Sequence, residues 1–194
     1  MISVLLSCGA TIAGVLDDNS DLWGRSVLGV PVLGPLSEIQ NLASCSAVIG
    51  VGDNADRRAV AEQFSGIEWA RVIYPGAYVN PTASIGAGTV VFPGAIIAAD
   101  VVIGAHVIVS GHATVGHDTI LEDFTQVAPG VHIGGGVRVG SGTLLAIGSI
   151  VCPGVQIGAG AVLAAGAVAV RDIPAGCTAF GIPARPRYPT GRSA

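Results

Sequence analysis

The chain has 194 residues, of which 51% are hydrophobic, 11% charged and 5% aromatic. Its net charge of -4 argues against a nucleic-acid-binding surface, and no apolar run approaches the roughly 18 residues that a membrane span needs. The four scattered cysteines form no zinc-type pair and are typical of free thiols in a reducing cytosol, so we expect a cytoplasmic protein.

The first 72 residues alternate between extended and helical patterns, which predicts a small α/β domain with a parallel sheet. Residues 11–16 and 46–52 are the expected strands, and each runs into a turn-forming polar group. Ligands of such sheets bind beyond the carboxyl ends of the strands. The candidate substrate ligands are therefore Asp17, Asp18, Asp53 and Asn54. The same residues are also ordinary turn formers, and the sequence leaves both interpretations open.

Two helices are expected in this part of the chain. Ser37 is placed to cap a short helix that runs through Leu42. Residues 55–64 have the spacing of an amphipathic helix, with Arg57 and Arg58 facing solvent.

A six-residue repeat runs from Val79 to Val168, and a further hexad at 73–78 extends it upstream. Fifteen hexads fill the first range without insertion; the first residue of each is Val, Ile or Leu, and the fifth is Ala, Thr, Val or Ser. A fixed period indicates stacked structural units, and a period of six fits neither an α-helix nor an alternating strand. The proline- and arginine-rich residues 171–194 are expected to form an irregular tail that folds back on the repeat.

The hexad pattern resembles that of the hexapeptide-repeat acyltransferases. The resemblance implies a left-handed parallel β-helix of about five turns, with three hexads per turn and the first and fifth residues pointing inward. It also implies a homotrimer whose active sites lie between chains, acetyl-CoA as co-substrate and no metal. Such apolar prism faces are expected to be covered by neighbouring chains.

Several segments narrow the resemblance to a subfamily of sugar acetyltransferases. They are the strand ending at Asp17, PVLG (31–34), IGVGDN (49–54), GHDTILEDFTQVAPG (116–130) and GIPAR (181–185). Together they resemble the sialic acid O-acetyltransferases and the N-acetyltransferases of bacillosamine and perosamine biosynthesis. The implied domains are a nucleotide-sugar-binding-like domain at 1–72, a β-helix at 73–170 and a tail at 171–194. The resemblance implies a Rossmann-like first domain, and we expect it to be shortened, because the family's first strand and glycine-rich turn are not found ahead of residues 1–8, either through truncation or through a misplaced start codon.

His117 matches the catalytic histidine of this family. Transfer of an acetyl group to a sugar amine or hydroxyl needs a general base, and the ordinary pKa of a histidine, about 6.5, suits that task. Asp118 could hold the tautomer of the imidazole. Adjacent residues of a regular strand point apart, so a His117–Asp118 contact requires a corner in the chain. Without the resemblance, the plainer interpretation of His117 and Asp118 is a solvated surface pair.

Other contacts to the coenzyme and the sugar follow from the same comparison. Gly135 comes eighteen residues after His117, so it should lie directly above it, and the resemblance makes its N–H the donor to the thioester carbonyl. Glycines are also common at prism corners, which is the plainer interpretation. Gln126 stands where some members carry a second histidine of the coenzyme pocket, and Ser110 stands where many carry asparagine near the substrate. The candidates for the CoA phosphates are Arg185 and Arg187, which also read as solvated tail residues.

Two other functional classes remain open from the sequence. The spacing of His112 and His117 resembles two zinc ligands of the γ-class carbonic anhydrases. That family takes its third histidine from the region that here surrounds Gly76, where there is none, so His106 or His132 of a neighbouring chain would have to serve. Catalytic zinc needs three protein ligands. The third class is a non-catalytic β-helix scaffold.

Overall fold

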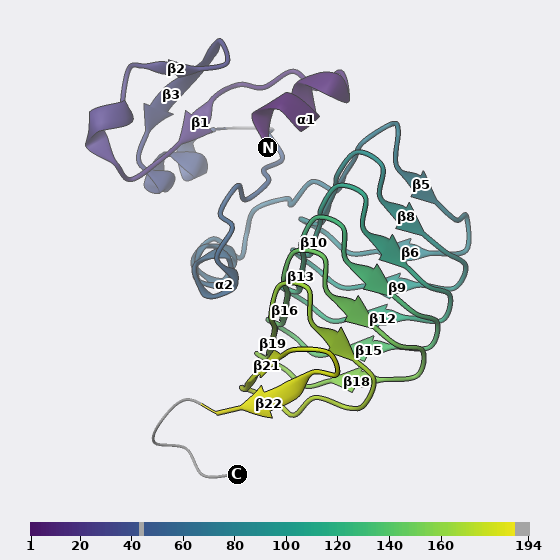
Figure 1. Ribbon diagram of the computed structural model, residues 1–194. Coiled ribbons are helices and arrows are strands. Elements are labelled where there is room, and N and C mark those ends of the chain that lie inside the picture. Colours follow the sequence, from purple (N-terminus) through teal and green to yellow (C-terminus); the bar gives the residue numbers. More distant parts are fainter. Residues whose placement is uncertain (43–44, 189–194) are drawn as a thin grey trace.

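The computed structural model describes residues 1–42 and 45–188 (Figure 1). An N-terminal segment of short helices and strands lies beside a prism built from three parallel sheets. The elements of the N-terminal segment are α1 (Ile2–Ser7), β1 (Val15–Leu16), the 3-10 helix η1 (Ser20–Leu22), β2 (Ser26–Val27), β3 (Val30–Gly34), the 3-10 helix η2 (Leu36–Asn41) and α2 (Asn54–Gln63).

The strands of the N-terminal segment are shorter and less regular than the sequence predicts. The strand expected over 11–16 is limited to β1, and the one expected over 46–52 is reduced to a single bridge between Ala47 and Trp69. The sheet has the order β1-β3-β2; β3 pairs with β1 in parallel, as predicted, and with β2 in antiparallel fashion, which was not predicted. Apolar composition indicated extended chain here, but strand pairing is decided by which neighbours are in reach.

Two predictions about the helices also need correction. The short helix near Ser37 is the 3-10 helix η2; its N-cap is Pro35, and no side chain caps it. In α2, Asp53 is the N-cap and accepts bonds from the N–H groups of Ala55 and Asp56. Arg57 does not face solvent, as the amphipathic spacing predicted; it is 1% exposed.

The prism consists of three sheets whose strands each pair with the strand eighteen residues further on. The first sheet holds β4 (Val72–Ile73), β7 (Val90–Val91), β10 (Ile108–Val109), β13 (Gln126–Val127), β16 (Leu144–Leu145), β19 (Val162–Leu163), β21 (Thr178–Phe180) and β22 (Arg185–Arg187). The second holds β5 (Tyr78–Val79), β8 (Ile96–Ile97), β11 (Thr114–Val115), β14 (His132–Ile133), β17 (Ile150–Val151) and β20 (Val168–Ala169). The third holds β6 (Ser84–Ile85), β9 (Val102–Ile103), β12 (Ile120–Leu121), β15 (Arg138–Val139) and β18 (Gln156–Ile157). This is the left-handed parallel β-helix that the resemblance implied.

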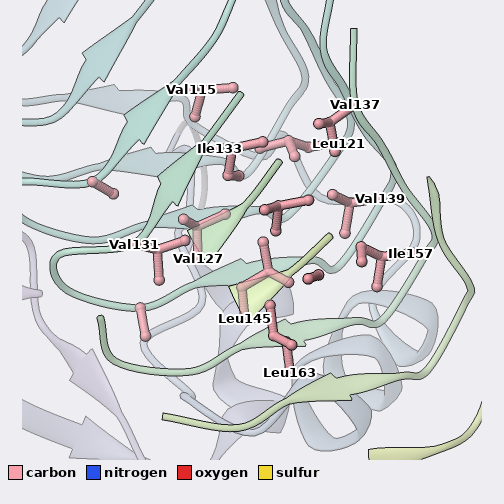
Figure 2. Close-up of a cluster of buried hydrophobic side chains, with 14 of the residues drawn as sticks. Val115, Leu121, Val127, Val131, Ile133, Val137, Val139, Leu145, Ile157 and Leu163 are labelled. Carbon is pink, nitrogen blue, oxygen red and sulfur yellow. The ribbon is translucent and has the colours of Figure 1, made fainter. Parts of the chain in front are cut away.

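The hexad rule is a burial rule. The aliphatic first residues, such as Val115, Leu121 and Val127, are at most 1% exposed and point toward a common centre (Figure 2). The small fifth residues, such as Thr119, are equally buried and fit where the chain turns from one sheet to the next. Each layer therefore buries its neighbours, as in other stacked-repeat proteins.

The corners between sheets depend on a left-handed backbone conformation at the fourth residue of the hexad. Glycine occupies most of these positions, but five are filled by residues with a side chain and φ between 54° and 58°. They are Asp100, His106, His112, Asp118 and Phe124. Side chains carried at these positions in successive turns form columns along the edges of the prism.

The tail is more regular than predicted. β21 continues the first sheet by pairing with β19, and β22 returns antiparallel to it. The expected irregular tail is therefore wrong for residues 178–187, and its last six residues, 189–194, lie outside the described residues. Within the part of the chain that the structure describes, no helix is both long and apolar enough to span a membrane.

The N-terminal segment is joined to the prism at the edge between the third and first sheets, where Figure 1 shows α2. A stack of flat groups forms the centre of this junction. Trp69 meets His106 edge-on at a centroid distance of 5.1 Å, and His106 lies nearly parallel to Phe124 at 5.2 Å. The guanidinium carbon of Arg58 lies 4.4 Å from the centroid of the Phe124 ring.

Arg57 ties the same junction together through its buried guanidinium. Its Nε donates to the carbonyl of His106 at 2.9 Å, and Nη2 donates to the carbonyl of Phe124 at 3.0 Å. Nη1 donates within the N-terminal segment to the carbonyls of Val51 and Gly52. Burial lowers the pKa of Arg57, and the nearby charge of Asp53 partly opposes this shift.

Candidate active site

His117 and Asp118 form an ion-pair-capable dyad on the edge between the second and third sheets. His117 Nδ1 lies 2.7 Å from a carboxylate oxygen of Asp118, and their side chains are 70% and 65% exposed. The contact is possible because Asp118 occupies the left-handed corner position, with φ of 57°. A carboxylate accepts, so Nδ1 carries the proton and Nε2 keeps the lone pair that a general base needs.

The free nitrogen of His117 faces Gly135 on the next turn. A methyl group added at Gly135 would lie 2.5 Å from His117 Nε2, so a side chain there would displace the imidazole ring. The turns are also joined by a bond from Gly136 N–H to the carbonyl of His117 at 2.8 Å. Among the described residues, no group accepts a hydrogen bond from the N–H of Gly135.

The repeat itself shows what such an amide can bind. Ala105 and Ser141 hold the same hexad position as Gly135, at another edge of the prism. The N–H of Ala105 donates to the carboxylate of Asp123 at 2.7 Å, and the N–H of Ser141 donates to Glu122 at 3.0 Å. Amides in this position therefore point outward and bind negatively charged oxygen. At Gly135 the same donor is left open beside a basic nitrogen.

The predicted coenzyme contacts do not lie at this edge of the same chain. Gln126 projects from β13 on the first sheet, and Ser110 lies at the edge between the first and second sheets. Arg185 and Arg187 are exposed on β22, where Arg187 lies 5.9 Å from the ring centroid of Phe180. Only His117, Asp118 and Gly135 are brought together within one chain.

The four polar residues predicted to bind substrate each have a structural partner, which lies within the N-terminal segment for the three aspartates and on the prism for Asn54. Asp17 accepts from Asn19 N–H, and Asp18 accepts from Leu36 N–H. Asp53 caps α2, and the side-chain amide of Asn54 donates to the carbonyl of Gly142 at 2.9 Å. These bonds correspond to the turn-former interpretation, and each carboxylate bonds with a single oxygen.

The remaining histidines lie at different edges of the prism. His112 is at the edge between the first and second sheets, and His106 is buried at the edge between the third and first. Thr114 bonds the ring of His132 on the face of the second sheet. No group of three metal-binding side chains occurs within residues 1–42 and 45–188. The spacing of His112 and His117 thus spans two edges instead of forming one chelating pair.

Sequence reasoning missed the junction residues. His106 and Phe124 are large side chains eighteen residues apart at a corner position that usually carries glycine. That spacing was a usable signal for a stacked pair on one edge. Arg57 gave no comparable signal, because its partners are backbone carbonyls far away in the sequence.

A left-handed β-helix that carries a histidine–carboxylate pair and an open amide at one edge defines the class of hexapeptide-repeat transferases. Comparison with known proteins agrees with this geometry. Residues 1–64 match the family model described as the PglD N-terminal domain. Perosamine N-acetyltransferase from Caulobacter crescentus, crystallised as a mutant with CoA and GDP-perosamine, is 35% identical with a TM-score of 0.90, covering 96% of this chain and 90% of that one.

A second solved structure supports the same assignment. The acetyltransferase domain of PglB from Neisseria gonorrhoeae is 35% identical with a TM-score of 0.89, covering 95% of this chain and 92% of that one. The same domain has also been solved in complex with acetyl coenzyme A. The chain belongs to the family of hexapeptide-repeat sugar acetyltransferases that includes these enzymes.

Two further similarities carry less information. WeeI from Acinetobacter baumannii is 23% identical with a TM-score of 0.70, which supports the fold. An uncharacterized protein of Acanthamoeba polyphaga mimivirus is 32% identical over 88 residues, and that match spans 45% of this chain but 18% of the viral protein.

Proposed function

We propose that this protein transfers the acetyl group of acetyl-CoA to an amino or hydroxyl group of a nucleotide-linked sugar. The observation that carries the proposal is the position of His117 Nε2 beside the open N–H of Gly135. Relatives solved with CoA and GDP-perosamine, or with acetyl coenzyme A, support the choice of donor and acceptor.

In the proposed reaction His117 acts as the general base. The acceptor nitrogen or oxygen attacks the thioester carbonyl carbon while Nε2 removes its proton, and Asp118 stabilises the resulting imidazolium. Negative charge collects on the former carbonyl oxygen, where the N–H of Gly135 can donate to it. The intermediate collapses with cleavage of the C–S bond, and the imidazolium returns the proton to the departing thiolate. No acyl-enzyme is needed, because acceptor and thioester react directly.

The site is proposed to be completed in a homotrimer. Apolar side chains remain exposed on the second sheet: Tyr78 is 56% exposed, Ile96 46% and Ile150 39%. A prism face of this kind is more stable when a neighbouring chain covers it. Contacts from Gln126 and Ser110 would then reach the coenzyme or substrate of a neighbouring chain, because neither lies at the edge that carries His117 in its own chain.

The proposal also covers the groups that bind the two substrates and the cellular compartment of the reaction. The exposed guanidinium groups of Arg185 and Arg187 are our candidates for the CoA phosphates. The turns of the N-terminal segment that hold Asp17 and Asp53 are our candidates for acceptor binding, through the carboxylate oxygens that make no local bond. We place the reaction in the cytoplasm, where free thiols such as that of Cys177 stay reduced.

The test is release of CoA thiol from acetyl-CoA in the presence of a panel of acceptors. The panel contains GDP-perosamine, other GDP- and UDP-linked amino sugars, and free sialic acid as a hydroxyl acceptor. We expect turnover with a nucleotide-linked sugar and a product that gains one acetyl group by mass spectrometry. Absence of CoA release with every acceptor, or stoichiometric zinc with chelator-sensitive activity, would contradict the proposal.

A further inference from the structure

Thr119 braces the corner that carries Gly135. Its side chain is 0% exposed and points into the prism. The hydroxyl donates to the carbonyl of Gly134 at 3.0 Å and accepts from the N–H of Val137 at 3.3 Å. One hydroxyl therefore links the two ends of the four-residue corner 134–137.

Many other corners are closed by a direct backbone bond. At corners 128–131 and 164–167, the N–H of the fourth residue donates to the carbonyl of the first, at 3.4 Å and 3.0 Å. Corner 134–137, whose residues are all described, makes no such direct bond, and neither do corners 98–101 and 116–119 on the same edge. At corner 134–137 the hydroxyl of Thr119 is therefore the group that joins the two ends.

Among the described residues, one other corner has its two ends joined by a threonine hydroxyl. Thr89 donates to the carbonyl of Gly104 at 2.8 Å and accepts from Val107 N–H at 2.9 Å. That corner belongs to the edge between the third and first sheets, away from His117. Thr89 is also 0% exposed, so the chain contains two chemically matched braces of which one adjoins the candidate active site.

We infer that Thr119 is a positioning residue that holds the Gly135 amide in place to stabilise the transition state; this rests on the proposed function. The corner is fixed by five bonds: Thr119 makes two of them, Gly134 N–H donates to Val151, Gly136 N–H donates to His117, and the Gly135 carbonyl accepts from Gly154 N–H. These bonds leave the Gly135 N–H open between them. The Gly134 carbonyl belongs to the same peptide group as the Gly135 N–H, so loss of the hydroxyl frees that peptide to rotate away from its outward position.

The magnitude follows from how oxyanion donors act. Removing one such donor lowers kcat by about 10²–10³-fold, and a misplacement of about 1 Å in a catalytic group can cost about 10²-fold. Displacing the Gly135 amide without removing it should therefore lower kcat by about 10- to 100-fold. The KM values for acetyl-CoA and acceptor should stay within about twofold, because the donor acts mainly in the transition state.

Thr119→Val, Thr119→Ser and Thr89→Val are compared with the wild type in the CoA-release assay at saturating substrates. We expect the loss of kcat in Thr119→Val alone, since Thr119→Ser keeps the hydroxyl and Thr89→Val removes an equivalent hydroxyl at another edge of the prism. Wild-type kcat in Thr119→Val, an equal loss in Thr89→Val, or a comparable loss in Thr119→Ser would each overturn the inference.

Crystal structures of the wild type and Thr119→Val give a readout that does not depend on turnover. In the variant we expect the Gly134–Gly135 peptide to be rotated, so that the Gly135 N–H no longer points outward. An unchanged corner would overturn the inference. If the wild type acetylates no acceptor, the proposed function fails, while this comparison still decides whether Thr119 positions the amide.

Discussion

Replacing Arg57 by methionine should loosen the N-terminal segment from the prism. Two hydrogen bonds of the guanidinium cross the junction, to the carbonyls of His106 and Phe124. Neither carbonyl has another partner among the described residues. Methionine keeps an unbranched apolar stem of similar length, so the change removes the bonds and the charge more than the packing.

The expected cost can be worked from these bonds. A hydrogen bond to a charged group contributes about 1.5–3 kcal/mol, so losing two costs about 3–6 kcal/mol before compensation. Part of this is recovered, because the variant no longer buries the charge whose desolvation lowers the pKa of Arg57. We expect a net loss of about 2–4 kcal/mol in the free energy that holds the junction together.

Arg58 provides the matched control, since it is the same residue type one position along α2. It donates to the hydroxyl of Ser141 at 2.6 Å and stacks on Phe124. A partly exposed cation–π contact contributes about 0.5–1 kcal/mol, so Arg58→Met should cost about 1 kcal/mol. The difference between the two variants isolates the buried bonds from the general effect of removing an arginine.

The assay is urea denaturation followed by tryptophan fluorescence and by circular dichroism. In a Trp23→Phe background, Trp69 is the only tryptophan, and it reports the junction through its contact with His106. We expect Arg57→Met to shift the fluorescence transition to lower urea while the β-helix signal in circular dichroism keeps its midpoint. A shift smaller than about 1 kcal/mol, or an equal shift in Arg58→Met, would refute the reasoning.

Three further predictions concern the dyad, the amide and the buried histidine. His117→Ala should lower kcat by about 10²–10⁴-fold, the usual contribution of a general base, and Asp118→Asn should lower it less. Gly135→Ala should lower kcat by at least about 10²-fold, because its methyl group would meet His117 Nε2 at 2.5 Å. Burial is the larger cause that lowers the pKa of His106, the charge of Arg57 lowers it further, and the charge of Asp123 opposes both. The His106 imidazole therefore binds a proton more readily in the unfolded chain than in the folded one. Stability should therefore fall as the pH drops below about 6.5, by up to about 1.4 kcal/mol per pH unit, and His106→Gln should reduce that slope.

The variants of His117, Asp118 and Gly135 are assayed by CoA release at saturating substrates, and light scattering verifies that their assembly state is unchanged. Gly66→Ala is the control for the glycine, since a methyl group there meets no atom within 4 Å. Near wild-type turnover in His117→Ala would remove the proposed base. Equal pH slopes in urea denaturation of the wild type and His106→Gln, from pH 8 to pH 5, would exclude the buried imidazole as the source.

How much was predictable differs between the two parts of the chain. The hexads from Val79 onward repeat one burial rule, so composition and period were enough to predict the stacked fold and the handedness came from the resemblance. The N-terminal segment has no such repetition. Its expected strands at 11–16 and 46–52 are mostly irregular, because pairing there depends on tertiary neighbours that local sequence does not specify.

The sequence by itself determined the six-residue period, and with the three hexads per turn that the resemblance implied, it placed Gly135 over His117. Only the tertiary structure decided which groups at that edge are open: Asp118 turns toward His117 through a left-handed corner, and the Gly135 N–H has no partner among the described residues. It also decided that Arg57 is buried and that the Thr119 hydroxyl stands between Gly134 and Val137. The physical reason is that a period fixes which residues stack, whereas burial and hydrogen bonding depend on side chains and carbonyls that meet across turns and between segments.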